Sequence, residues 1–283
     1  MTQAKAKADN EKPRFILCAD DFALTEGVSR GILELLAANK ISATGAMTNR
    51  PHWQRLASEL MGFAARADLG VHLNLTCAAP LSIMPILAGS GQFPELGTLA
   101  RAALTSEAAR AEIRLEINHQ LDAFEQATGR APDFVDGHQH VHALPGIRGS
   151  VIDAIKTRYK PGAVYLRDPA DKISAIVRRG VAVKKALAVS ALASGLARQA
   201  KAAGIPVNQG FSGFSLFDPQ RGFAADMQRY LLSPGQRHLV MCHPGFADDE
   251  LTGLDPVTIT RNIEFRTLKN HDFKYINRFN KIF

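Results

Sequence analysis

Short apolar runs alternate with longer amphipathic segments along this chain, and that alternation most restricts how it can fold. Parallel strands joined by crossover helices produce such a pattern, so the sequence predicts a succession of βαβ units. The predicted strands are 15–19, 41–47, 69–75, 134–135, 163–166, 205–207 and 239–242. The predicted helices are 25–39, 53–67, 106–128, 149–159, 171–203 with a weak point at Gly180, and 223–232. A loop is expected over 80–97.

The composition is that of a soluble globular protein, with 46% hydrophobic and 22% charged residues among 283. No linker divides the chain, so we expect a loose tail at 1–13 and one domain over 14–283. The polar start lacks the apolar core of a signal peptide, which favours a cytoplasmic location. No apolar run reaches the roughly 18 residues that a membrane span requires. The odd, scattered cysteines suit buried, reduced thiols and are Cys18, Cys77 and Cys242.

The chain is basic, with a net charge of +7 from 34 Lys+Arg and 27 Asp+Glu. The basic residues gather over 269–281 and at Arg178, Arg179, Lys184 and Lys185. A solvated helix face and a basic tail explain this clustering, while binding to an anionic surface stays open. No nucleic-acid-binding motif accompanies the charge, so no nucleic-acid partner is expected.

The segment Asp136-Gly-His-Gln-His-Val-His142 places a carboxylate and three imidazoles at every second position. If the backbone is extended there, the four side chains leave one face of a strand. Metal binding or proton transfer would use such a group. The alternative is an accidental cluster in an exposed loop.

Two further strand ends carry polar residues. Asp20 and Asp21 follow the first apolar run, and adjacent carboxylates favour a cationic partner such as a metal. A helix N-cap with solvent exposure is the alternative. His72 lies on the polar side of an alternating segment, 70–76, where it is either a ligand or a buried core histidine.

His243 and Arg167 also end predicted strands. His243 precedes Pro-Gly at a strand exit and suits a general acid with a pKa near neutral. Arg167 could pair with Asp20, with substrate, or with a surface carboxylate. Active sites of parallel α/β folds lie at the carboxyl ends of the strands, which is where all these residues fall.

Four segments in order carry a resemblance to a known family: 18–22, 70–76, 136–142 and 240–246. Over about 14–247 the chain resembles the YdjC-like (ChbG/HpnK-type) carbohydrate deacetylases. The resemblance implies an α/β fold, an irregular TIM-type (β/α)-barrel-like arrangement with parallel strands. It also implies one divalent metal ion, either Mg²⁺ or Zn²⁺, with Co²⁺ or Mn²⁺ also compatible. Ala23 departs from the pattern, because the family commonly has glycine there.

The family's residue roles can be carried over by position. The implied metal ligands are Asp21, His72 and His138; Asp20 is the implied general base, His243 the general acid, and Arg167 a further catalytic residue. The residues implied to surround the ligands or contact substrate are His140, His142, Asn74 and Asp136. The implied reaction removes an N-acetyl group from an amino sugar or oligosaccharide, so an acetylated sugar or glycan is the expected partner.

Two rival functions remain at this point. One is another barrel metallohydrolase, acting on a phosphoester or a cyclic amide. The other is a non-catalytic sugar-binding protein. The sequence leaves open the sugar, the native metal, the role of 171–203 and the oligomeric state, including a homodimer.

Overall fold

The computed structural model describes residues 14–271 and 276–281, so the expected tail at 1–13 and part of the basic segment 269–281 lie outside the described residues. Seven strands form one sheet in the order β5-β4-β3-β2-β1-β7-β6. Every pairing in it is parallel. The strands are β1 (Phe15–Phe22), β2 (Ala43–Ala46), β3 (Asp68–Leu73), β4 (Phe134–Gly137), β5 (Tyr165–Leu166), β6 (Phe211–Ser212) and β7 (His238–Cys242).

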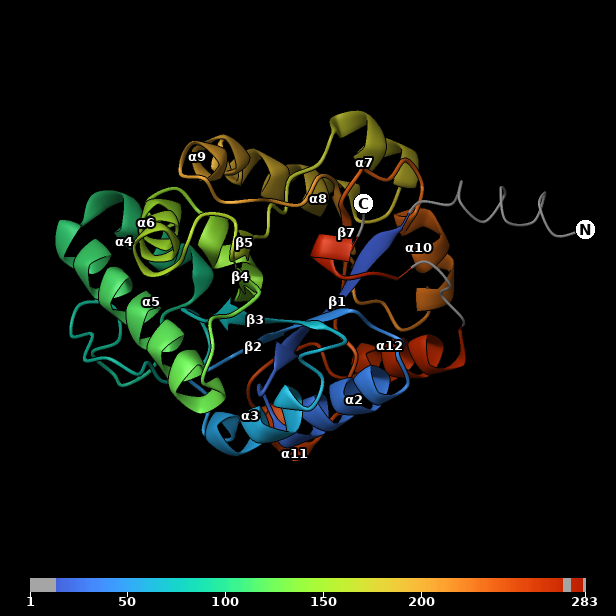
Figure 1. The fold of residues 1–283 in the computed structure, drawn as a ribbon, viewed down its shortest axis with the longest axis horizontal. Helices are drawn as coiled ribbons and strands as arrows, with labels where there is room; N and C mark the ends of the chain where they lie inside the picture. The colour runs from blue at the N-terminus through green and yellow to red at the C-terminus, as the bar shows by residue number, and fades with distance from the viewer. Residues whose placement is uncertain (1–13, 272–275, 282–283) are drawn as a thin grey trace, which may run out of the picture.

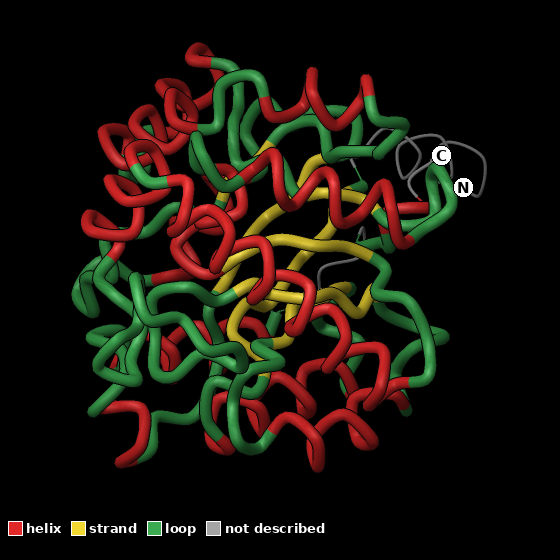
Figure 2. The backbone as a smooth tube through the Cα atoms, turned by 90° about the vertical axis from the view of Figure 1, so that its left-hand side faces the viewer, coloured by secondary structure: helices red, strands yellow, loops and turns green. Residues whose placement is uncertain are grey.

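The sheet is curled, and helices surround it (Figures 1 and 2). An isolated parallel bridge between Leu166 and Val207 spans the gap between the edge strands β5 and β6. The predicted irregular barrel of parallel strands is therefore confirmed. The helices are α2 (Glu26–Ala37), α3 (Trp53–Met61), α4 (Leu96–Thr105), α5 (Glu107–Thr128), α6 (Arg148–Arg158), α7 (Ile173–Arg179), α8 (Val183–Leu192), α9 (Leu196–Ala202), α10 (Phe223–Tyr230), α11 (Asp249–Thr252) and α12 (Ile259–Asn270). The 3₁₀ segments are η1 (His138–Ala143) and η2 (Phe279–Lys281).

Local sequence explains where the long helices begin and end. The Thr25 hydroxyl accepts a hydrogen bond from the Val28 N–H at the start of α2, and the Ser106 hydroxyl accepts one from the Ala109 N–H at the start of α5. Helix α5 ends at Gly129, whose φ of 68° belongs to the left-handed region that glycine adopts freely. The strands β1 and β7 are buried throughout, as expected of parallel strands covered on both faces.

The structure corrects two predictions about the C-terminal half and adds one helix there. The predicted strand 205–207 is irregular, and β6 instead occupies Phe211–Ser212. The single helix expected over 171–203 is three helices, α7 to α9. Helix α12 was not predicted, because its buried face carries the polar side chains of Thr260, Arg261 and Glu264.

Because all the pairings are parallel, the carboxyl ends of β1, β3, β4, β5 and β7 lie at the same rim of the curled sheet. All three cysteines are buried and free, as predicted. Among the described residues, no helix combines the length and apolar character needed to cross a bilayer.

Candidate metal centre

The two adjacent carboxylates lie at an irregularity in β1. The pairing of β1 with β2 shifts register between Ala19 and Phe22, and Asp21 has a φ of 71°. Ala23 follows with a φ of 70°, a conformation that glycine adopts at less cost. Asp20 and Asp21 are nevertheless only 2% and 1% exposed. Both carboxylates therefore need partners inside the protein.

Three side chains from three strand ends converge on one point. The Asp21 Oδ1 atom lies 3.2 Å from His72 Nε2 and 3.0 Å from His138 Nδ1. One donor atom from each residue lies within 4.8 Å of the other two. A carboxylate oxygen and two imidazole nitrogens at this separation form a ligand set that suits a divalent transition metal and leaves further coordination positions open.

The surroundings of these donor atoms fit a metal ion. His72 Nδ1 lies 2.7 Å from Asp136 Oδ1, so the second ring nitrogen, Nε2, is the one that faces Asp21. Arg261 donates to Asp21 Oδ2 at 2.7 Å, which leaves Oδ1 facing the imidazoles. Metal-binding histidines commonly hold their other ring nitrogen in this way, because the contact fixes the ring's orientation and tautomer.

Asp20 is held by a buried arginine, one of the pairings expected for Arg167. Arg167 Nη1 donates to Asp20 Oδ2 at 2.7 Å, and Nη2 donates to Oδ1 at 2.6 Å. The same guanidinium forms an ion pair with Asp136 and contacts Cys18 Sγ. Cys18, Asp20 and Asp136 form a second cluster of metal-type ligands, and Arg167 already supplies its positive charge.

These pairings determine the charge states. Burial would raise the pKa of Asp20, but the Arg167 guanidinium lowers it to about 2. Burial would lower the pKa of His72, but Asp136 and Asp20 raise it to about 10. The carboxylates around His72 therefore favour positive charge beside them, which a metal ion bound to the neutral ring would supply.

The histidine-rich segment does not have the extended backbone that was considered. Strand β4 ends at Gly137, and η1 follows, with Gln139 and His140 at φ values of 51° and 61°. The three histidines consequently diverge. His142 is fully buried and donates from Nε2 to the Arg167 carbonyl at 2.9 Å, whereas His140 packs its ring edge-on against Phe211 and Phe214. Among the three, only His138 lies beside Asp21.

His243 leaves the end of β7 and is half-buried. Its backbone N–H donates to Glu264 Oε2 at 2.5 Å, and its ring packs edge-on against Phe217. Burial lowers the pKa of His243 to about 4, below the near-neutral value expected from the sequence. His243 is neutral at pH 7 and would have to gain a proton before donating one.

Asn74 is buried and does not reach the donor atoms of the candidate centre. Its Oδ1 accepts from the Thr76 and Cys77 N–H groups, and its Nδ2 donates to the Cys77 carbonyl. These contacts fold the chain back after β3, so Asn74 shapes the loop. Two contacts were missed because α12 was not predicted: Arg261 donates to Asp21, and Glu264 accepts from the His243 N–H. The polar spacing of 261 and 264 on one helix face was the available signal.

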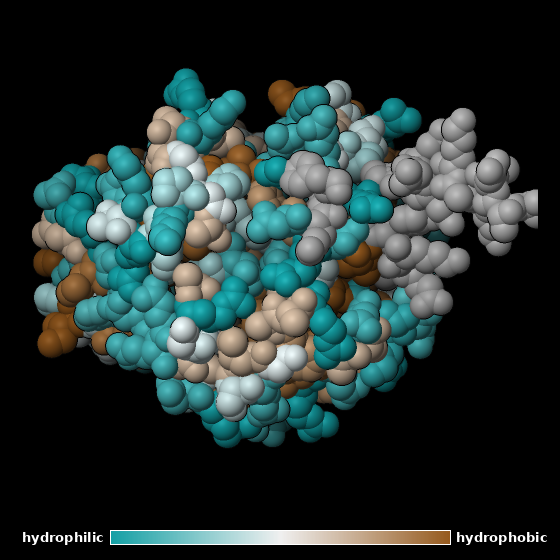
Figure 3. All heavy atoms as spheres, viewed as in Figure 1, coloured by the Kyte–Doolittle hydropathy of each residue, from teal (hydrophilic) through white to brown (hydrophobic). Residues whose placement is uncertain are grey.

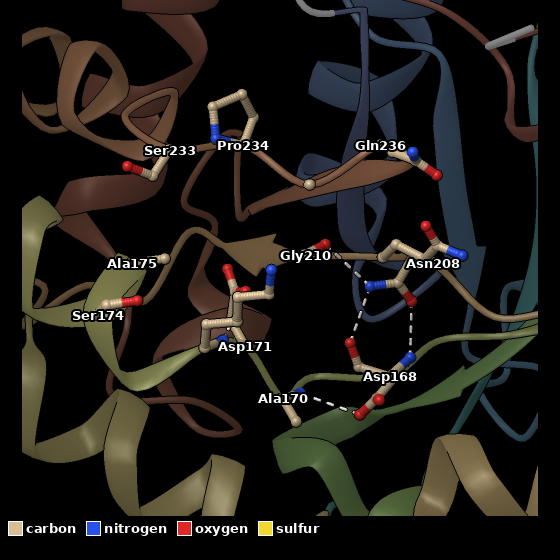
Figure 4. Close-up of a pocket in the computed structure, with 13 residues that line it drawn as sticks. Asp168, Ala170, Asp171, Ser174, Ala175, Asn208, Gly210, Ser233, Pro234 and Gln236 are labelled. Atoms are coloured by element: carbon tan, nitrogen blue, oxygen red, sulfur yellow. Dashed lines mark hydrogen bonds between the residues drawn. The ribbon is translucent and has the colours of Figure 1, made fainter.

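A cavity of about 980 Å³ lies away from this centre (Figure 4). It opens between the segments that follow β5 and those that precede β6 and β7, and none of its lining residues holds the converging donor atoms. Asn208 crosses its floor, accepting from the Asp168 N–H and donating to the carbonyls of Asp168 and Gly210.

Comparisons with known proteins show the family of this chain. The family model for YdjC-like proteins matches residues 14–278. The carbohydrate deacetylase of Geobacillus stearothermophilus is 35% identical over 153 residues, which are 52% of this chain and 58% of that protein. The chitooligosaccharide deacetylase of Enterobacter sp. strain 638 is 36% identical over 142 residues, 47% of this chain and 51% of that protein. The chain thus spans between half and two thirds of the length of these relatives.

A solved structure shows a similar fold. A protein of Enterococcus faecalis V583, whose suggested role is cellobiose-phosphate cleavage, has a TM-score of 0.67 and is 20% identical. The alignment covers 92% of both chains. At that identity the similarity establishes the fold alone.

Proposed function

The chain belongs to the YdjC-like protein family, and from this premise we propose that it is a divalent-metal-dependent hydrolase that removes an N-acetyl group from an amino sugar or oligosaccharide. One observation carries the proposal. Donor atoms of Asp21, His72 and His138 converge within 4.8 Å, next to a carboxylate, Asp20, that an arginine holds in its ionised form. We also propose a cytoplasmic location, which three free, buried thiols suit.

Each residue of the candidate centre has its own role in the proposed hydrolysis. Asp21, His72 and His138 would hold the metal, which supplies Lewis acidity toward an amide carbonyl and toward water. Asp20 takes a proton from the attacking water, and Arg167 keeps its carboxylate oriented for that transfer. The water oxygen bonds to the carbonyl carbon and the C–N bond then breaks. The proton taken from water passes through His243 to the leaving nitrogen, giving acetate and a free amine.

The second ligand cluster argues against the rival with two metals. Cys18, Asp20 and Asp136 could in principle hold another cation, but the buried Arg167 guanidinium contacts all three. Two carboxylates that already share an arginine, with His72 also paired to Asp136, attract a second divalent ion weakly. We therefore propose one metal ion per chain.

An acetate-release screen over N-acetylated sugars, with and without a chelator, tests the proposal. We expect at least one chelator-sensitive substrate and one bound metal ion per chain. His138→Ala should abolish metal binding and activity, while His119→Ala on α5 should preserve both. Acetate release that persists after chelation and in His138→Ala would refute the mechanism, and two ions per chain would favour the rival metallohydrolase.

A further inference from the structure

The segment from 172 to 201 concentrates most of the molecule's excess positive charge. It contains seven basic residues and no Asp or Glu. Arg179 is buried and paired with Asp171 at 2.7 Å. The other six are exposed and form no ion pair within the part of the chain that is described: Lys172, Arg178, Lys184, Lys185, Arg198 and Lys201. These six nearly account for the net charge of +7.

Large apolar side chains lie among these cations. Ile173 is 69% exposed and Val177 58% exposed on α7, and Leu192 is 48% exposed at the end of α8. On α7 the exposed residues 173, 174, 177 and 178 follow helical spacing, so Ile173, Val177 and Arg178 share one face. Figure 3 shows apolar next to hydrophilic residues along the upper edge, where Figure 1 places α7 and α8. We name the six cations and three apolar residues the basic helical surface.

Neighbouring elements do little to neutralise this surface. Asp168 shares the cavity of Figure 4 with Lys172, and Asp255 exerts an electrostatic influence on Lys185. Arg229 of α10 adds a further cation, donating to the Arg179 carbonyl at 3.2 Å. The surface therefore presents exposed cations that an anionic ligand could contact.

Phe217 connects the basic helical surface to His243. Lys185 Nζ lies 4.7 Å from the centre of the Phe217 ring, which packs edge-on against His243. Leu216, beside Phe217, is 62% exposed. The apolar and cationic character thus extends to the edge of the site.

We infer that the basic helical surface docks the protein on a lipid bilayer containing anionic lipids. Helices with lysine and arginine beside exposed apolar residues bind at that interface, where the cations meet lipid headgroups and the apolar side chains enter the acyl boundary. Nucleic acid would satisfy the cations but leave Ile173 and Val177 without a favourable contact. The inference stands apart from the proposed deacetylation, because it concerns only binding.

Sedimentation with phosphatidylcholine vesicles, with and without phosphatidylglycerol, tests this inference on the full chain. We expect binding to the phosphatidylglycerol vesicles at low salt, weakened by added salt. Arg178→Glu with Lys184→Glu should lower binding at least about tenfold, because each basic residue near an anionic leaflet strengthens binding severalfold. Ile173→Asp with Val177→Asp should also lower it severalfold.

Matched controls lie on α4 and α5, on another side of the molecule (Figure 1). Arg101→Glu with Arg114→Glu repeats the charge change, and Leu104→Asp with Leu115→Asp repeats the apolar change, at exposed positions. Both should bind vesicles like the parent. The inference fails if the parent ignores phosphatidylglycerol or if the control pairs lose binding equally. Binding to RNA that only the charge reversals weaken, without vesicle binding, would identify nucleic acid instead.

Discussion

The candidate centre and the basic helical surface differ in the burial and pairing of their cations. Arg167 and Arg261 are fully buried, and each guanidinium contacts two carboxylates. On α7 and α8, by contrast, Arg178 and Lys184 are exposed and form no ion pair within the described residues. Removing a buried cation leaves its partner carboxylates unpaired and destabilises the fold. An exposed cation without such partners contributes little to stability and can bind another molecule.

The largest effect should follow from removing a buried cation. Arg167→Met would leave Asp20 and Asp136 buried without their shared partner. Breaking a buried ion pair from one side costs about 3 to 5 kcal/mol. Urea unfolding should show that loss, with Arg178→Met on α7 as the matched control. Equal stability of the two variants would contradict the contrast between the regions.

Asp20→Asn tests the chemistry of the buried network while keeping the side chain's shape. We expect kcat for acetate release to fall at least about a hundredfold, the low end for losing a general base. Metal content, measured on the purified protein, should stay at the parent level, because Asp20 is not among the converging donors. Activity close to that of the parent would exclude Asp20 as the base.

Glu264 gives the network a pH dependence. Burial raises the pKa of Glu264 to about 7 from an ordinary value near 4.5. The folded state therefore binds more protons than the unfolded state between about pH 4.5 and 7, so stability falls as pH rises through that window, by at most about 3 kcal/mol. Glu264→Gln should flatten this dependence in urea unfolding at pH 5 to 8. Parallel curves for the parent and the variant would rule out this titration.

The smallest effect belongs to the exposed cations. Arg178→Ala with Lys184→Ala should change the free energy of unfolding by no more than about 0.5 kcal/mol per site, because neither residue has an ion-pair partner to lose among residues 14–271 and 276–281. Acetate release from soluble sugars should be unchanged. A stability loss of several kcal/mol would mean that these cations are structural.

The sequence predicted the strands that deliver the candidate centre because each is a buried apolar run followed by a polar residue. Asp20, Asp21 and His243 were found in this way, and His72 was found from the alternating segment 70–76. The backbone conformation of η1 could not be predicted from the sequence, because Gln139 and His140 adopt positive φ angles that are uncommon for residues other than glycine. Helix α12 was missed because it buries the charged side chains of Arg261 and Glu264. Hydrophobic periodicity does not detect a helix whose buried face is charged.

The hydrogen bond from Arg261 to Asp21 joins residues 240 positions apart. During synthesis, the ribosome has already made β1 to α11 before it translates codon 261. Until residue 261 is made, Asp21 lacks its guanidinium partner. A prematurely terminated product that ends before α12 would therefore have the strands of the barrel but an incomplete centre.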